Sequence, residues 1–168
     1  MDVYVSLATE RLAEDDEFDV GEMGVACVAA LAGERVYYFE EGDWSRLADL
    51  LGYAHLVVGV NSFTREGVEH VAGGFDADYL GVQELVSDAA GTRVSLDNVA
   101  RATLDRPRPD AIQLPLEWQN DRHGKVRRAL KQDVLLLREL HRRMQQGTVS
   151  YVDPESMEKR SVDVDLDV

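Results

Sequence analysis

The order of hydrophobic patterns along the chain constrains the fold more than any other feature of the sequence. Three β-type runs come first, at residues 3–7, 23–31 and 35–39, and the tight turn Ala32-Gly33-Glu34 separates the last two. Beyond residue 44, helical and β-type patterns alternate. Three antiparallel strands followed by crossover helices and parallel strands predict an α/β fold, with a mixed five-stranded sheet and helices on its faces.

The later elements follow from their spacing and their end signals. Residues 55–60 form a continuous apolar run, which is typical of a central strand buried on both faces. Asp43 and Ser95 each precede a helical pattern and are expected N-caps. The remaining expected elements are helices at 44–52, 64–71, 83–90, 96–104 and 123–146 and a strand at 79–82.

The last part of the chain is expected to add a hairpin to this domain. Three of the four prolines lie between residues 105 and 122 and predict an irregular loop there. Residues 149–152 and 161–164 are β-type runs, so residues 146–168 are expected to form a C-terminal hairpin extension. A length of 168 residues suits one core, and we expect residues 1–168 to form a single domain.

Charge is distributed unevenly along the sequence. The formal net charge is −14, but residues 1–92 contain 19 acidic and 4 basic side chains, whereas residues 93–143 contain 7 acidic and 12 basic ones. A basic segment in an acidic protein is the usual electrostatic footprint for phosphate backbones. A solvated helix face that pairs with the acidic half of the chain accounts for the segment equally well.

Other compositional features bear on the cellular compartment. Only three of the eighteen basic residues are lysines, and an acidic, lysine-poor surface is typical of proteins in a high-salt, halophile-like cytoplasm. Cys27 is the only cysteine, which excludes an internal disulfide and a cysteine-based zinc site. The sequence has neither a basic leader nor a long apolar run, so we expect a cytoplasmic protein without a membrane span.

Asp133 is the most informative single residue of the long helix expected at 123–146. An apolar stripe runs along this helix at helical spacing, and Asp133 lies in the middle of the stripe. A carboxylate is expensive to bury unless a metal ion, a backbone amide group or a basic side chain meets it. From this helix alone, an ion pair with an arginine is the favoured explanation.

Two motifs and one helix occur in an order and at distances that resemble a known family. The run Val58-Gly59-Val60-Asn61, followed by Glu66, resembles the second motif of 3′–5′ exonucleases, with Glu in place of Asp. Residues 94–104 are similar to the leucine- and alanine-containing helix before the third motif, and Asp133-Val134 matches the metal-binding Asp of that motif. Residues 3–152 together resemble the DEDDy branch of the ribonuclease H-like 3′–5′ exonucleases.

The resemblance implies a two-metal site that is largely degraded. Members of the family hold Mg²⁺ or Mn²⁺ with four carboxylates, so that one ion activates a water and the other stabilises the leaving oxygen. Ser6 and Ala8 stand where the first motif has its two carboxylates. Ala129 replaces the tyrosine that orients the attacking water in the family.

The remaining carboxylates define the candidate metal ligands and catalytic residues. Glu66 and Asp133 are at family positions, and Glu10 lies just past the first motif as a further candidate ligand. Two ligands on separate elements would hold one metal ion weakly. Catalysis is therefore expected to be absent or very weak, with Mg²⁺ or Mn²⁺ as the cofactor of any residual activity.

Three hypotheses for the function follow. The leading one is an exonuclease-like domain with a degraded site that binds nucleic acid, single-stranded by preference, or a protein partner. The second is an active metal-dependent 3′–5′ exonuclease with a rearranged ligand set, and the third is a protein-interaction module, with the oligomeric state left open. The side chains expected to contact phosphates are Arg122, Lys125, Arg127, Arg128 and Lys131.

Overall fold

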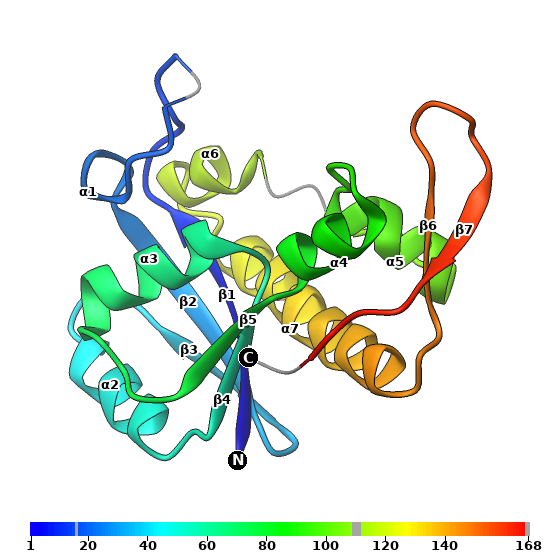
Figure 1. Ribbon diagram of the computed structural model, residues 1–168. Coiled ribbons are helices and arrows are strands. Elements are labelled where there is room, and N and C mark those ends of the chain that lie inside the picture. The colour runs from blue at the N-terminus through cyan, green and yellow to red at the C-terminus, as the bar shows by residue number, and fades with distance from the viewer. Residues whose placement is uncertain (16, 109–111, 167–168) are drawn as a thin grey trace.

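The computed structural model describes residues 1–15, 17–108 and 112–166 and contains a mixed five-stranded sheet (Figure 1). The strand order is β3-β2-β1-β4-β5. β2 is antiparallel to β1 and β3, whereas β4 is parallel to β1 and β5. The strands are β1 (Asp2–Thr9), β2 (Val25–Ala32), β3 (Arg35–Phe39), β4 (Leu56–Gly59) and β5 (Asp78–Gly81). The α/β class and the mixed five-stranded sheet predicted from the pattern order are confirmed.

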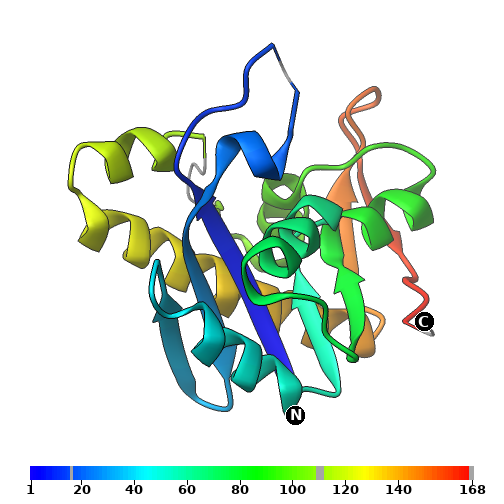
Figure 2. The ribbon, with the colours of Figure 1, turned by 90° about the vertical axis from the view of Figure 1, so that its left-hand side faces the viewer.

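Helices cover both faces of this sheet (Figures 1 and 2). α2 and α3 pack on one face, and α4, α5 and α7 pack on the other. The helices are α1 (Val20–Met23), α2 (Trp44–Gly52), α3 (Ser62–Ala72), α4 (Val82–Ala90), α5 (Leu96–Leu104), α6 (Leu114–Gln119) and α7 (His123–Gln145). Among the described residues, no helix combines the length and the apolar composition that crossing a membrane requires.

The central strand β1 sends its side chains alternately into these two layers. Val3 and Val5 are fully buried under α2 and α3, whereas Tyr4 and Ala8 belong to the core beneath α7. The same alternation directs Ser6 toward α7. β1 and β4 run parallel, so their carboxyl ends meet at one edge of the sheet. Open α/β sheets commonly bind ligands at such an edge.

A hairpin of β6 (Val149–Val152) and β7 (Lys159–Val162) docks on α5 beyond the sheet. Two side chains of α5 bind the β6 backbone. Asn98 bonds to both the N–H and the C=O of Val152 at 2.8 Å, and Thr103 does the same for Ser150 at 3.0 Å. These four hydrogen bonds pair the backbone N–H and C=O groups of Ser150 and Val152 on the edge of β6 that faces away from β7.

The structure corrects four local expectations. The acidic loop ends in the short helix α1, and the proline-rich segment contains α6, whose Pro115 suits the first turn of a helix. β7 begins two residues earlier than the predicted run. Asp43 precedes α2 without a side-chain capping bond, whereas Ser95 caps α5 as predicted, by accepting from the Asn98 N–H at 3.1 Å.

Candidate functional site

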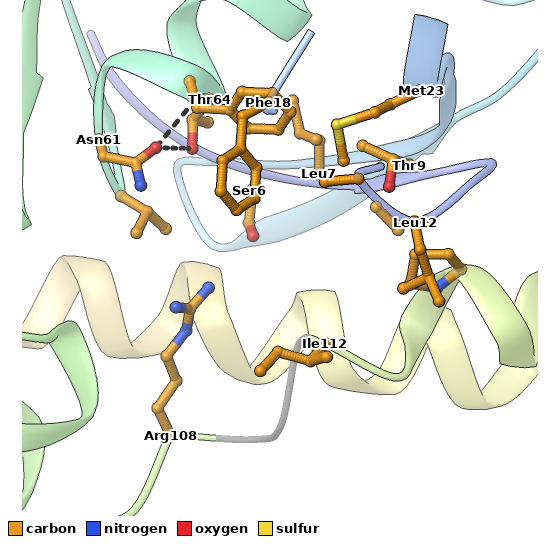
Figure 3. Close-up of a pocket in the computed structure, with 15 residues that line it drawn as sticks. Ser6, Leu7, Thr9, Leu12, Phe18, Met23, Asn61, Thr64, Arg108 and Ile112 are labelled. Atoms are coloured by element: carbon orange, nitrogen blue, oxygen red, sulfur yellow. Dashed lines mark hydrogen bonds between the residues drawn. The ribbon is translucent and has the colours of Figure 1, made fainter. Parts of the chain in front are cut away.

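The carboxyl ends of β1 and β4 open into a pocket of about 490 Å³ (Figure 3). Four segments line it: the end of β1, the β1–α1 loop with the end of α1, the β4–α3 connection with the start of α3, and the residues between α5 and α6 with the start of α6. Figure 3 shows Ser6, Asn61 and Arg108 toward one side of the pocket and Leu12 and Ile112 toward the other. Ser6, Asn61 and Arg108 therefore define a polar side of the pocket, although Phe18 lies beside Ser6 and Thr9 lies beside Leu12.

A buried carboxylate of α7 lies beside the polar side of the pocket. Asp133 is 3% exposed, and Arg108 binds it with two parallel hydrogen bonds, from Nε to Oδ1 at 3.0 Å and from Nη2 to Oδ2 at 2.9 Å. The Ser6 hydroxyl donates a third bond to Oδ2 at 2.9 Å. Both carboxylate oxygens are thus engaged, and the ion pair with an arginine that the helix alone favours for Asp133 is confirmed, whereas the resemblance assigned Asp133 to metal binding.

A second carboxylate fixes the backbone of Arg108. The Arg108 N–H donates to Asp97 Oδ1 at 2.7 Å, and Arg101 Nε donates to Asp97 Oδ2 at 2.9 Å. Burial by itself lowers the pKa of the Arg108 guanidinium, but the hydrogen bonds and the attraction of Asp133, together with Asp97, outweigh burial and raise it. Arg108 is therefore a fixed, fully charged group in the site.

Asn61 holds the opposite wall at the start of α3. Its Oδ1 accepts from the Thr64 N–H at 3.1 Å and from the Thr64 hydroxyl at 3.3 Å, which caps the helix. Tyr79 donates to the Asn61 carbonyl at 2.6 Å. Gly59 is required for this contact, because a Cβ at that position would collide with the Tyr79 hydroxyl. The Asn61 amide nitrogen, in turn, makes no hydrogen bond to a described residue.

The structure does not gather the predicted metal ligands into one cluster. Glu66 is on an exposed turn of α3 and does not line the pocket. The Glu10 side chain lies against Gly24 and next to Arg11. Asp133 is engaged by Arg108, and the described part of the chain contains no group of three or more His, Cys, Asp or Glu side chains that could hold a metal ion. Of the other family positions, Ala8 lines the pocket and Ala129 packs against the core.

Three of the five basic side chains predicted to contact phosphates are paired with glutamates. Arg122 and Lys125 both contact Glu117 at 3.2 Å, and Arg127 contacts Glu40 at 2.9 Å. The other two, Arg128 and Lys131, are exposed on α7 and have no ion pair within the described residues. The positive charge of the basic segment is therefore partly compensated.

Sequence reasoning required a partner for Asp133 but did not identify Arg108. The feature that could have identified Arg108 is the sequence Arg106-Pro107-Arg108, because this segment is rich in prolines that restrict the backbone. The apolar side chains of the pocket were missed as well, because Leu12, Phe18 and Ile112 lie in segments expected to be irregular. Comparison with models of known protein families and with curated proteins gives no match.

Proposed function

We propose that this chain is a ribonuclease H-like domain of the exonuclease type that no longer hydrolyses phosphodiesters and that serves as a binding domain. The sheet supports the fold assignment, since three antiparallel strands and then two parallel ones, in the order β3-β2-β1-β4-β5, are what the resemblance implies. The position of the pocket at the carboxyl ends of β1 and β4 supports the assignment of the site.

One observation carries the proposal: the guanidinium of Arg108 binds the carboxylate of Asp133, to which the resemblance assigns a metal ion. A divalent ion at Asp133 would compete with two charge-assisted bonds and the Ser6 bond, and it would lie beside the partly buried guanidinium of Arg108. Removing one partner of a buried pair costs about 3–5 kcal/mol. Two like-charged groups close to one carboxylate would also repel each other.

The donor set of the pocket does not fit a two-metal centre. Mg²⁺ and Mn²⁺ prefer several carboxylate or carbonyl oxygens. The pocket offers hydroxyl and amide groups from Ser6, Thr9, Asn61 and Thr64 and a positive charge from Arg108. A rearranged ligand set of Glu66, Asp133 and Glu10 gains no support from the positions of these side chains. No metal-dependent step is therefore assigned to this chain.

A protein is the partner class that the site favours. The pocket is largely apolar, and the β1–α1 loop beside it carries exposed carboxylates that would repel phosphates. Single-stranded nucleic acid is the second candidate and is favoured by one observation: Arg128 and Lys131 are exposed on α7 and form no ion pair with any residue that the structure describes. Binding there would weaken strongly with added salt.

Mn²⁺ titration tests the proposal directly. We expect the wild-type chain to leave the electron paramagnetic resonance signal of free Mn²⁺ unchanged up to millimolar concentrations. An Asp133→Asn variant should give the same result, because Asp133 is not a ligand. Loss of the free-ion signal in the wild type and its return in Asp133→Asn would show a metal site and refute the proposal.

A further inference from the structure

Large apolar side chains form an exposed rim around the pocket. Leu12, Phe18 and Ile112 are 43%, 66% and 72% exposed, and all three line the pocket. The Phe18 ring packs edge-on against Phe63 of α3, with ring centroids 5.9 Å apart, so the rim is held to the body of the domain. Exposed apolar side chains that converge on one hollow mark interaction sites more often than isolated ones do.

The acidic turn next to this rim decides which kind of partner fits. Glu14, Asp15 and Glu17 lie between the pocket residues Ala13 and Phe18, and all three are exposed. The Glu17 N–H donates to the Glu14 carbonyl at 2.8 Å, which makes the turn tight. None of the three carboxylates has an ion pair with a described residue. In Figure 1 this loop projects at the top of the molecule, beyond the ends of the strands.

We infer that the pocket receives one bulky apolar side chain from a cationic extended segment of another protein. This inference rests on the proposed function, because a pocket that held metal ions and phosphates would not be free for such a side chain. A volume of about 490 Å³ lies within the usual range of about 300–1,000 Å³ for ligand pockets. The apolar rim would bury this side chain, which we call the anchor. The acidic turn would attract the positive charges on either side of the anchor.

The polar side of the pocket suits the backbone of such a segment. The Asn61 amide nitrogen and Arg108 Nη1 make no hydrogen bond to a described residue. Both are donors, and both would meet a backbone carbonyl beside the anchor. A second copy of this chain fits less well, since each copy carries a net charge of −14 and an acidic turn at the mouth of the pocket.

Selection from a random peptide library displayed on phage, with the full chain as bait, tests this inference. We expect the enriched peptides to combine a net positive charge with a tryptophan, phenylalanine or leucine. The selected peptide is then synthesised with a fluorescent label, and its binding is followed by fluorescence anisotropy at low and high salt. Enrichment of acidic peptides, or no enrichment, would overturn the inference.

Matched variants assign the binding to this site. Phe18→Ser removes an exposed wall of the rim, and Glu14→Lys/Glu17→Lys neutralises the turn by raising the formal charge of residues 14–17 from −4 to zero; each should weaken binding at least about tenfold. Glu155→Lys/Glu158→Lys makes the same charge change on the exposed tip of the β6–β7 hairpin and should change the affinity by less than about twofold. Equal affinity in all variants would contradict the inference.

The two proposals fail in different ways. If a preparation neither binds Mn²⁺ nor cleaves nucleic acid and also fails to bind peptides, only the inference that the pocket receives a cationic segment is refuted. Metal-dependent cleavage by the same preparation would refute the proposed function, whatever the peptides show.

Discussion

Replacement of Arg108 by methionine should destabilise the protein through the carboxylate that it leaves behind. Arg108→Met removes both charge-assisted bonds to Asp133, whose side chain is 4% exposed, and among the described side chains it leaves the Ser6 hydroxyl as the donor to this carboxylate. Removing one partner of a buried pair costs about 3–5 kcal/mol. The Arg108 side chain is 20% exposed, so we expect the lower end, about 3 kcal/mol. For a chain of this size that loss lowers Tm by about 6–12 °C.

Urea unfolding followed by circular dichroism measures this loss of stability in Arg108→Met beside the wild type.

A double variant completes the test. Arg108→Met/Asp133→Leu replaces the ion pair with apolar groups, and the free energy of unfolding should return to within about 1–2 kcal/mol of wild type. The reasoning is refuted if Arg108→Met loses less than about 1 kcal/mol, or if the double variant is no more stable than the single one.

Three further effects follow from contacts outside the pocket. Burial lowers the pKa of His141, which bonds to the Tyr4 hydroxyl at 2.8 Å. Because the unfolded state then binds the proton more readily, the stability of the protein should fall as the pH drops below 6.5. In thermal melts, His141→Phe should reduce the dependence of Tm on pH in this range. Thr103→Val leaves the Ser150 N–H and C=O of β6 unpaired and should cost about 1–2 kcal/mol, with faster amide exchange at Ser150. Burial raises the pKa of Cys27 to about 12, so a thiol reagent should label it only in denaturant.

The sheet could be predicted from the sequence because its signals are local. Alternation in β1 and the continuous apolar run of β4 each identify a strand, and Gly33 marks the turn between β2 and β3. Helix boundaries followed from the same kind of signal: Ser95 caps α5 with its own side chain. The short helices α1 and α6 were missed, since four to six residues carry too little periodicity.

The site was predictable only in part, because its partners are far apart in sequence. The apolar stripe of α7 predicted that Asp133 needs a partner, but Arg108 lies 25 residues earlier in a proline-rich segment with no periodic signal. The pairing of Arg127 with Glu40, 87 residues apart, is of the same kind. Local patterns identify which residues need a partner, whereas the tertiary fold decides which partner they have.

Turnover of labelled single-stranded DNA and RNA with Mg²⁺ or Mn²⁺, at low and high salt, tests the central claim most directly. The measurement is made beside an Asp133→Ala variant, as in any test of a metal-dependent nuclease. We predict no loss of 3′ nucleotides from either substrate, in the wild type or in the variant, because Arg108 and not a metal ion binds Asp133. Stepwise 3′ shortening by the wild type that disappears in Asp133→Ala would contradict this account.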